Sequence, residues 1–597
     1  MHGWMGRVLR VDLTREETRT EPLDGELAAT YLGGRGMGMR LLFDEARGVA
    51  DPLAPENLLV FAAGPITGTV APTSGRFSVT TLSPLTGTGF DANSGGRWGP
   101  MLKAAGFDAL AIQGAAERPV VLEVVEGSAR LVEAGGLWGA NVPETTGALA
   151  GKGRSVACIG PAGERLVRLA AIMNDGTRAC ARGGVGAVMG SKRLKAIVVG
   201  GGARPSVADP EGFEFVRYET GKMLKANPVT ARGLPEFGTA ALINILNEAG
   251  ALPTRNYQLS RFDQAEAISG EALKSRFVTG KRGCWGCPIA CTRRTKVGDV
   301  QGEGPEYESL WALGADCGIA DLETIVRANY LCNELGLDTI SVGATIACAM
   351  ELSEQGLLSG GPVFGDATQL LPLVRATAYR EGLGDELAEG SARLAARHGA
   401  PQLAMQVKGM EIPAYDPRAM QSQGLAYATS NRGGCHLRAN MMGPTVLGLP
   451  KLVDRMNGRG QAGLAIEIQN LNAVLDSLVM CKFGHMALAE DHYARLLSTV
   501  TGRRFSEGEM LRTGERIWTL ERLYNLRRGF TAKDDTLPPR LLEEPAQVGP
   551  ARGRVVELAP MLEEYYRFRG WTREGIPSER KLAELGLSAE GKEALGC

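Results

Sequence analysis

The chain lacks any long apolar run and any dominant sign of charge. No stretch reaches the roughly 18 apolar residues of a membrane span, and residues 1–10 contain no apolar segment of signal-peptide type. Lys plus Arg (66) nearly cancels Asp plus Glu (67), so no whole-chain field attracts nucleic acid or an acidic membrane surface. We expect a soluble, unexported, cytoplasmic protein that binds neither nucleic acid nor membranes.

An ordered disulfide framework, internal repeats and low-complexity tracts are absent too. The 11 cysteines are odd in number and irregularly spaced, as expected of reduced thiols in the cytoplasm. With 597 residues, 44% of them apolar and 22% charged, the chain has globular proportions and room for about three or four domains.

Helical periodicity is scarce before residue 200 and common after it. Alternation over 6–22 predicts a β-hairpin, and further short β-rich runs follow. Residues 200–205, Gly-Gly-Gly-Ala-Arg-Pro, are the clearest linker. The expected strands are 58–63, 77–82, 109–113, 120–125, 156–159 and 196–199, and the expected helices are 209–226, 239–248, 321–335, 340–354 and 471–483. A mainly β domain therefore precedes a mainly α part.

Three cysteines, Cys284, Cys287 and Cys291, stand in the spacing C-x2-C-x3-C. Soft ligands this close indicate a metal, either zinc or an iron–sulfur cluster, with a fourth ligand from elsewhere. Zinc ribbons usually carry a second C-x2-C pair, which is missing, and radical-SAM enzymes use the reverse spacing. The spacing favours iron–sulfur and leaves zinc open; unligated core thiols fit poorly beside Gly286, Pro288 and Arg293.

Glycine is abundant, with 80 residues, and four glycine-rich segments each carry an arginine. Glycine lets main-chain N–H groups approach an anion and arginine supplies a charged fork, so together they favour a large anionic cofactor. Ordinary β-turns would explain any one of them. Neither the dinucleotide nor the P-loop fingerprint fits. The segments, which we predict to be loops, are 33–38, 73–76, 93–97 and 182–192.

Two helices are predicted to meet at residues 335–339. Asp321 is a suitable N-cap for the first, Gly336 has the position of its C′ glycine, and Asp338 or Thr339 caps the second. Capping alone would explain these residues. A carboxylate beside new helix N–H groups could also bind a ring N–H or an amine.

Ordered motifs along nearly the whole chain resemble the tungsten-dependent aldehyde ferredoxin oxidoreductases. The resemblance runs from Tyr31 to Pro577. Its motifs are Tyr31–Gly36, Gly64–Pro65, Ser74–Phe77, Ala92–Gly96, Arg182–Lys192, Cys284–Cys291, Gly304–Glu308, Asn333–Asp338, Tyr415–Arg418, Leu425–His436, Gly570–Trp571 and Gly575–Pro577.

The resemblance implies an α+β multidomain fold and a metal cofactor. A β-rich saddle domain (1–205) would bind a tungsten bis-molybdopterin, with molybdenum possible, and two mainly α-helical domains (206–412 and 413–597) would follow. A 4Fe-4S cluster would take Cys481 as the fourth ligand beside Cys284, Cys287 and Cys291. Mg(II) would bridge the pterin phosphates near Asn93.

The resemblance also assigns pterin-binding residues. Two motifs depart from the family pattern: Asn333 replaces a leading Asp, and Val479–Met480 replace Gly-Leu. The implied cofactor contacts are Arg76, Asn93, Gly95, Arg182, Gly183, Asn333, Gly336, Leu337, Asp338, Asp476 and Met480.

The implied reaction is oxidation of a small aldehyde to a carboxylic acid, with electrons passing to ferredoxin or to a dedicated electron-transfer subunit. We predict Glu308, His436 and Tyr415 as acid–base residues, since water or the aldehyde must exchange a proton; sequence does not separate Glu308 from Glu306. Cys317, Cys332, Cys348 and Cys435 fit buried thiols.

Other functions stay open at this point. One alternative is the catalytic subunit of a class II benzoyl-CoA reductase, or a carboxylate-reducing homologue. Another, from a different class, is a non-enzymatic scaffold held by zinc. No histidine has Glu three residues before it, so the family's dimer-bridging metal motif is missing, and either a homodimer or a hetero-oligomer is possible.

Overall fold

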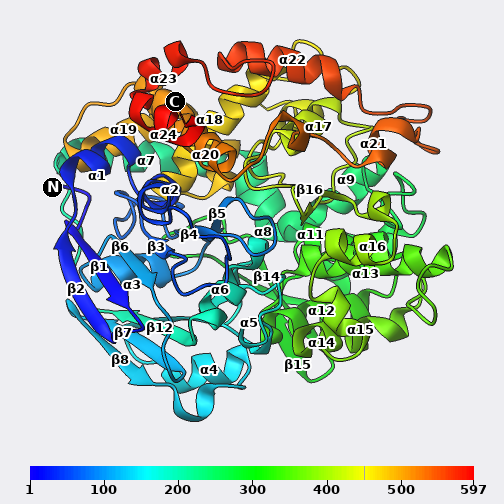
Figure 1. The fold of residues 1–597 in the computed structure, drawn as a ribbon, viewed down its shortest axis with the longest axis horizontal. Coiled ribbons are helices and arrows are strands. Elements are labelled where there is room, and N and C mark those ends of the chain that lie inside the picture. The colour runs from blue at the N-terminus through cyan, green and yellow to red at the C-terminus, as the bar shows by residue number, and fades with distance from the viewer. Residues whose placement is uncertain (450, 597) are drawn as a thin grey trace.

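Two β-sheets near the N-terminus and a larger helical part make up the protein. The computed structural model describes residues 1–449 and 451–596. In Figure 1 the sheets lie together at the left, the central helices at the right, and the C-terminal helices across the top. The architecture is therefore mixed α/β and multidomain, with a β-sheet N-terminal region and a helical C-terminal part, which confirms the coarse prediction of fold class.

The first sheet has the strand order β2-β1-β6-β3-β4-β5. The predicted hairpin forms its edge, and β1 pairs in parallel with β6 while β3, β4 and β5 continue antiparallel. The strands are β1 (Arg7–Asp12), β2 (Glu17–Pro22), β3 (Leu59–Ala62), β4 (Phe77–Leu82), β5 (Gly89–Ser94) and β6 (Ala109–Gln113).

The second sheet has the order β11-β10-β9-β12-β7-β8. Helix α3 (Trp98–Ala104) packs on it. The ring of the fully buried Trp98 lies 4.5 Å from that of Phe77 and 5.3 Å from that of Phe61 of the first sheet, centroid to centroid. One apolar core thus joins both sheets. The strands are β7 (Val120–Val125), β8 (Ser128–Glu133), β9 (Arg154–Cys158), β10 (Ile172–Asn174), β11 (Arg178–Cys180) and β12 (Leu194–Gly200).

The remaining chain is mainly helical. A three-stranded sheet of β13 (Val278–Arg282), β14 (Thr292–Val297) and β15 (Val300–Glu303) and a small hairpin of β16 (Gln406–Val407) and β17 (Met410–Glu411) are inserted in it. Among the helices of the described residues, none is both long and apolar enough to cross a membrane. Among the described residues of this part, the helices of eight or more residues are α7 (Pro210–Ala226), α12 (Leu322–Leu335), α13 (Thr339–Glu354), α14 (Leu370–Tyr379), α17 (Gln421–Ala428), α18 (Ala462–Leu478), α19 (Glu490–Thr501), α20 (Glu507–Arg527), α22 (Leu558–Arg569) and α24 (Ser588–Leu595). The shorter helix α11 (Tyr307–Leu313) carries Glu308.

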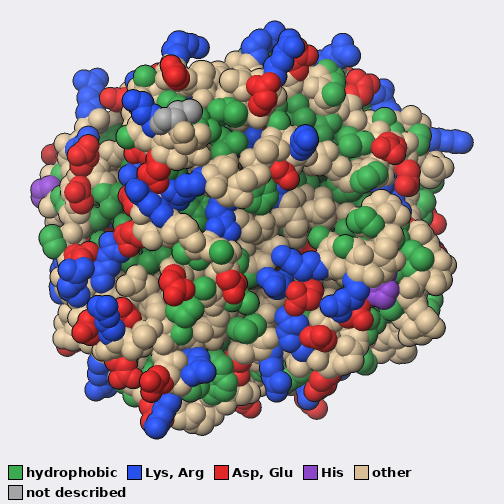
Figure 2. All heavy atoms as spheres, viewed as in Figure 1, with side chains coloured by type: hydrophobic (Ala, Val, Ile, Leu, Met, Phe, Trp, Pro, Cys, Tyr) green, Lys and Arg blue, Asp and Glu red, His purple; other side chains and the backbone are tan. Residues whose placement is uncertain are grey.

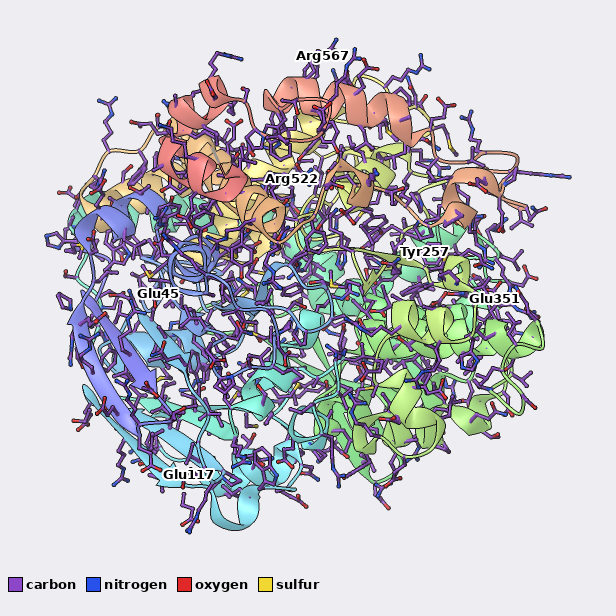
Figure 3. The ribbon with its side chains drawn as sticks, viewed as in Figure 1. Glu45, Glu117, Tyr257, Glu351, Arg522 and Arg567 are labelled. Atoms are coloured by element: carbon purple, nitrogen blue, oxygen red, sulfur yellow. The ribbon has the colours of Figure 1, made fainter. Side chains whose placement is uncertain are left out.

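The surface carries mixed charge. Figure 2 shows basic and acidic side chains interspersed over the visible face, in keeping with the nearly equal counts of the two signs. Figure 3 shows Arg567 on α22 at the outer edge of the molecule, whereas Arg522 of α20 lies further inside.

Strand prediction succeeded where apolar residues alternate or run together, and all seven predicted strand regions form strands. Two helix predictions were wrong in extent. Residues 238–241 form a 3-10 turn before a short helix, α9 (Leu242–Glu248), and α18 both begins and ends earlier than 471–483. β5 and β8 were missed because polar and small residues dominate both.

The prediction of four glycine-rich loops was wrong for two of them. Residues 34–38 begin helix α2 (Gly34–Glu45), and residues 185–191 form α6 (Val185–Ser191). Their glycines permit close packing instead: a Cβ at Gly38 would lie 2.2 Å from Thr80 Oγ1, and one at Gly190 would meet the Gly163 carbonyl. Chain crowding therefore explains these glycines without any ligand.

The C-terminal end of α18 lies against backbone of the N-terminal part. A Cβ at Gly34 would stand 2.4 Å from the Asp476 carbonyl oxygen, and one at Gly64 would stand 2.3 Å from that of Leu478. Glycine is thus required at this contact. The contact fixes where the chain emerges from α18, three residues before Cys481.

We expect Gly64→Ala to destabilise the protein by about 1–3 kcal/mol, because its Cβ would meet rigid backbone. Gly221→Ala, in α7 with nothing within 4 Å of the new Cβ, should instead stabilise it by about 0.5–1 kcal/mol. Guanidinium unfolding midpoints compare the two; equal midpoints would contradict the packing argument.

Candidate functional site

The Cys284–Cys291 motif forms the loop between β13 and β14. Two residues of the loop, Gly286 (φ 60°) and Ala290 (φ 49°), are in the left-handed region, which turns the chain tightly between the thiols. Cys481 follows α18, whose C-cap Val479 is left-handed as well (φ 49°). Turns on two distant segments therefore present the four thiols.

The two glycine-rich segments that are not helices lie against the cysteine loop. A Cβ at Gly95 would stand 2.7 Å from Cys284 Sγ, and one at Gly75 would stand 2.8 Å from the Trp285 Cβ. The Cys481 N–H donates to the Thr73 carbonyl at 2.9 Å. These segments thus bind the loop and Cys481 to the first sheet.

One cavity of about 630 Å³ joins the thiols to the predicted acid–base residues. Cys284, Cys287, Cys291 and Cys481 line it together with Glu308, His436 and Tyr415. In the described part of the chain, no three His, Cys, Asp or Glu side chains are spaced to hold a single metal ion. The four thiols instead face a shared space, which suits a multi-atom cluster.

Burial and neighbouring negative charge keep two of these thiols, Cys287 and Cys291, protonated in the absence of metal. Burial, and then the neighbouring Cys481, raise the pKa of Cys287 to about 12. Burial and Glu306 raise the pKa of Cys291 well above its usual value. Four thiolates in this space need a bound cationic centre to compensate their charge.

Glu308 and His436, whose side chains are 13% and 12% exposed, form a largely buried pair in the same cavity. Glu308 Oε1 lies 3.6 Å from His436 Nε2, and neither Glu308 Oε1 nor His436 Nδ1 has a hydrogen-bond partner. Burial raises the pKa of Glu308 to about 8. Burial and the charge of Arg182 lower the pKa of His436 well below its usual value. A neutral acid therefore stands beside a neutral base at pH 7.

Three tyrosines brace the backbone that holds Glu308. The Ala414 N–H donates to Glu308 Oε2 at 3.1 Å. Tyr307 donates to the Ala414 carbonyl at 2.6 Å, and Tyr257 and Tyr427 both donate to that of Pro413. Figure 3 shows Tyr257 inside the helical part. One carboxyl oxygen is thereby held and the other is left free toward His436.

Tyr415 and Glu306 take different places in the cavity. The Tyr415 ring lies 5.4 Å from that of His436, centroid to centroid. Glu306 accepts from the Thr239 hydroxyl at 2.5 Å, and its charge acts on Cys291. Glu308 thus faces His436, whereas Glu306 lies toward the cysteines.

Two predicted cofactor residues, Arg182 and Asp338, are paired with each other. Arg182 Nε donates to Asp338 at 3.2 Å, and its other nitrogens donate to Ser341 and to the carbonyls of Gly434 and Glu411. Asp338 caps α13 through the Ile340 N–H. Contact of either with a pterin stays a prediction.

The other predicted cofactor residues divide by position. Asn93 Nδ2 is buried without a partner while its Oδ1 accepts from Arg76. Gly336 is the left-handed C-cap of α12. Arg76, Gly95, Asn333 and Leu337 line the cavity, whereas Gly183, Asp476 and Met480 lie in the packed structure around it.

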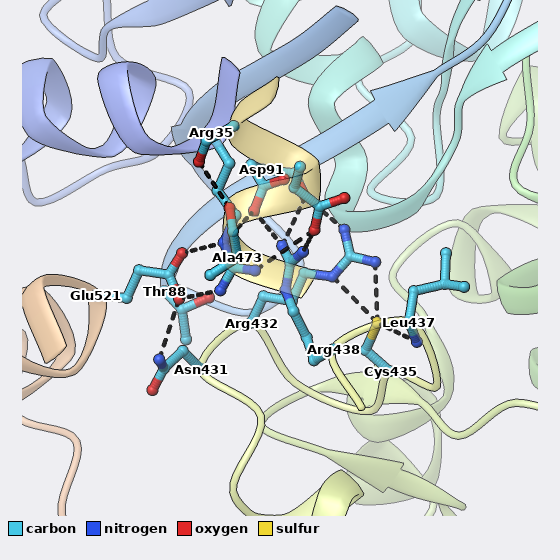
Figure 4. A network of polar contacts seen from close by, with 12 residues as sticks. Arg35, Thr88, Asp91, Asn431, Arg432, Cys435, Leu437, Arg438, Ala473 and Glu521 are labelled. Carbon is cyan, nitrogen blue, oxygen red and sulfur yellow. Dashed lines mark hydrogen bonds and ion pairs between the residues drawn. The ribbon is translucent and has the colours of Figure 1, made fainter. Parts of the chain in front are cut away.

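A buried charge network lies between the N-terminal and C-terminal parts (Figure 4). Arg438 bonds both Asp91 and Asp476, and Arg35 bonds Glu521. Although burial alone would raise the pKa of Asp476, the cations Lys482, Arg438 and Arg35 hold it below its usual range. Asp476 is therefore an anion fixed among cations.

Sequence reasoning missed the role of Cys435. The residue is buried, as predicted, but its sulfur accepts from Arg432 at 2.9 Å and from the Leu437 N–H at 3.3 Å. Burial alone would raise the pKa of Cys435, and Arg432 and Arg438 instead lower it to about 7. The sequence shows that Arg432 and His436 lie close to Cys435 in the chain. It could not predict that Arg432 contacts Asp91, because these two residues are 341 positions apart.

Four thiols that share a cavity with a carboxyl–imidazole pair are an arrangement that suits a metal-dependent redox enzyme. Comparison with known families agrees. The chain belongs to the aldehyde ferredoxin oxidoreductase family: the N-terminal domain of that family matches residues 8–201, and its domains 2 and 3 match residues 216–587. It is therefore an oxidoreductase.

Curated relatives extend over nearly the full chain. The tungsten-containing aldehyde ferredoxin oxidoreductases of Pyrococcus furiosus and Thermococcus kodakarensis are each 47% identical over 602 residues, which covers 98% of this chain and 100% of each relative. The aliphatic sulfonate oxidoreductase, WOR-like subunit, of Pyrococcus furiosus is 30% identical over 99% of this chain and 98% of its own.

A solved structure shares the fold. The active-site complex BamBC of benzoyl-coenzyme A reductase, bound to 1,5-dienoyl-CoA, superposes with a TM-score of 0.85. It covers 100% of this chain and 99% of that one at 24% sequence identity. This likeness concerns the fold.

We expect Glu308→Gln to change how stability depends on pH. The pKa of Glu308 is about 8 in the folded protein against an ordinary value of 4.5, so between these values the folded state binds the extra proton and stability falls as pH rises. The glutamine variant has no carboxyl group at this position, so its stability does not include this fall with pH. The stability of the wild type relative to the variant should therefore fall by up to ~1.4 kcal/mol per pH unit across this window. Denaturant midpoints at several pH values measure it, and a constant difference would contradict the assignment.

Proposed function

We propose that the protein oxidises aldehydes to carboxylic acids at a tungsten bis-molybdopterin centre and passes the electrons through one 4Fe-4S cluster to ferredoxin. The observation that carries the proposal is that four thiols and the Glu308–His436 pair line one cavity, in a chain whose relatives at 47% identity are tungsten-containing aldehyde ferredoxin oxidoreductases.

The residues present fit a large polar cofactor. Asn93 Nδ2 and Arg438 Nε are buried without partners, and such groups are costly unless something pairs with them. Arg76, Gly95, Asn333 and Leu337 on the cavity wall would hold the pterins, with Arg182, Gly183, Gly336, Asp338, Asp476 and Met480 behind them. Mg(II) near Asn93 would join the phosphates, and molybdenum remains an alternative to tungsten.

When bound, the tungsten centre would supply a two-electron acceptor for the net change R-CHO + H2O → R-COOH + 2e⁻ + 2H⁺. His436, neutral and with its Nδ1 unpaired, is one group that would accept a proton in the cavity, and Glu308 holds its own proton until about pH 8. Tyr415 supplies an aromatic wall against His436. Tyr415 is buried, and the side chains of Glu308 and His436 are only 13% and 12% exposed, which would limit the access of bulk water to the reacting atoms.

The four cysteines would bind the iron–sulfur cluster, and their cavity reaches the protein surface. Trp285, between Cys284 and Cys287, is 36% exposed, and the Arg97 guanidinium lies over its ring at 6.0 Å from the centroid. Basic side chains are exposed on the segments around the loop: Arg97, Arg232, Lys281 and Arg294. The exposed acid there, Glu236, pairs with Lys274.

This surface fits an acidic electron carrier, because an exposed aromatic ring within a basic rim provides both contact and electrostatic steering. Ferredoxin is the carrier that we propose; a dedicated subunit would use the same surface. The oligomeric state, homodimer or hetero-oligomer, stays a prediction.

We expect anaerobically purified protein, from a host that makes the pterin cofactor and is supplied with tungstate, to contain about one tungsten and about four iron atoms per chain. It should oxidise aldehydes with benzyl viologen as acceptor. Glu308→Gln should keep both metals and lose activity by roughly 10²–10⁴-fold, whereas Cys481→Ser should lose iron.

Metal analysis by mass spectrometry and viologen assays decide this test. Zinc alone would overturn the proposal in favour of the scaffold. Full metal content with benzoyl-CoA turnover but no aldehyde oxidation would contradict the proposal that aldehydes are the substrate.

A second prediction concerns the carrier. Arg97→Glu should raise the KM for an acidic 4Fe-4S ferredoxin roughly tenfold at low salt, with a smaller effect at high salt, and leave the viologen assay unchanged. Arg567→Glu, on α22 at the outer edge in Figure 3, is the matched control. An unchanged KM in Arg97→Glu would place the carrier elsewhere.

A further inference from the structure

Thr73 has an unusual backbone. It adopts φ 63°, a region that β-branched residues rarely enter because the side chain collides with its own backbone. Strained residues of this kind persist where surrounding structure enforces them and gather at functional sites. Thr73 lies in the Thr73–Arg76 segment and lines the cavity with all four cysteines.

The main chain of Thr73 is bonded and its side chain is not. Its carbonyl accepts from the Cys481 N–H at 2.9 Å. Its hydroxyl is buried without a hydrogen-bond partner. The backbone conformation thus places a free donor directly beside the residue that we propose as the fourth cluster ligand.

A second free hydroxyl lies in the same place. Tyr493 of α19 is fully buried, and its hydroxyl also has no partner. A Cβ built at Gly484 would stand 3.1 Å from Tyr493 Oη and 3.2 Å from Thr73 Oγ1. Both hydroxyls therefore flank one small space, beside the turn that begins at Cys481 and is closed by the Gly484 N–H bond to the Cys481 carbonyl.

Tyr493 also lies close enough to Cys481 for the two side chains to interact electrostatically. Burial, and then the charge of Cys481, raise the pKa of the Tyr493 phenol. The charged groups on the packed elements do not occupy the hydroxyl: His485 Nδ1 bonds the Leu488 carbonyl, and Lys482 bonds Asp476. The phenol therefore stays available as a donor.

Two buried hydroxyl donors without acceptors are unfavourable, since each has given up its bonds to water. A thiolate or sulfide is an acceptor of the kind both lack. Hydrogen bonds to the sulfur atoms of an iron–sulfur cluster help to set its reduction potential, because they stabilise the extra electron of the reduced state.

We propose that Thr73 and Tyr493 donate hydrogen bonds to sulfur at the Cys481 side of the 4Fe-4S cluster and raise its reduction potential. The inference rests on the proposed function, since it requires the cluster. Neither residue touches the aldehyde or moves a proton; both tune the cluster through which the electrons leave.

The test is an EPR-monitored redox titration of the full protein, with iron counted per chain. Tyr493→Phe and Thr73→Val remove one hydroxyl each and should shift the midpoint potential of the cluster to more negative values, additively in the double variant. Thr73→Ser keeps the hydroxyl and should keep the wild-type midpoint. Tyr565→Phe, which removes a buried hydroxyl bonded to Gln469 at 2.8 Å, is the matched control and should show no shift.

The outcomes separate the two proposals. Wild-type protein without iron or a cluster signal overturns the proposed function. A cluster with normal iron content whose midpoint is unchanged in Tyr493→Phe overturns the inference. Should Thr73→Val lose iron, Tyr493→Phe and Thr73→Ser still decide, because neither changes the Thr73 backbone contact with Cys481.

Discussion

The site depends on one close contact, the C-terminal end of α18 against glycine backbone of the N-terminal part. Side chains at Gly34 or Gly64 would collide with the carbonyls of Asp476 and Leu478. Because main chain meets main chain there, α18 has almost no freedom to slide. The contact holds Asp476 inside the charge network and directs the chain so that Cys481 lies near the cysteine loop. The position of the Cys481 thiol therefore depends on packing at Gly34 and Gly64.

Buried ion pairs determine the relative orientation of the two parts of the chain at this contact. Arg35, Arg438, Asp91 and Asp476 come from both parts of the chain and are almost completely buried. Ion pairs of this kind add little net stability after desolvation, yet any other alignment would leave a charge unpaired in the interior. Glycine contacts therefore set how closely the parts approach, and the ion pairs select one relative orientation.

Local pattern and long-range geometry account for what sequence could and could not predict. Alternating and apolar runs identified β4, β6 and β7 to the residue, since side-chain period determines which face is buried. The spacing of Cys284, Cys287 and Cys291 indicated a metal because such ligands lie close in the chain. Cys481 was named through resemblance alone. The glycines of α2 were misread as a loop because composition does not show that Gly38 faces Thr80. No sequence pattern around Thr73 predicts its role. That role follows from its positive φ angle and from the hydrogen bond that its carbonyl accepts from the Cys481 N–H.

The Glu308–His436 pair and the four cysteines line one cavity, and burial acts on the protonation of both groups. At Glu308 and His436, burial favours the neutral species, so neither side chain carries a charge at pH 7. Around the cysteines, burial likewise opposes bare thiolates, and only a cationic centre makes four of them tolerable. The same burial thus keeps Glu308 and His436 neutral and disfavours four unmetallated thiolates at the cysteines. A substitution that admits water to this cavity would relax both requirements together.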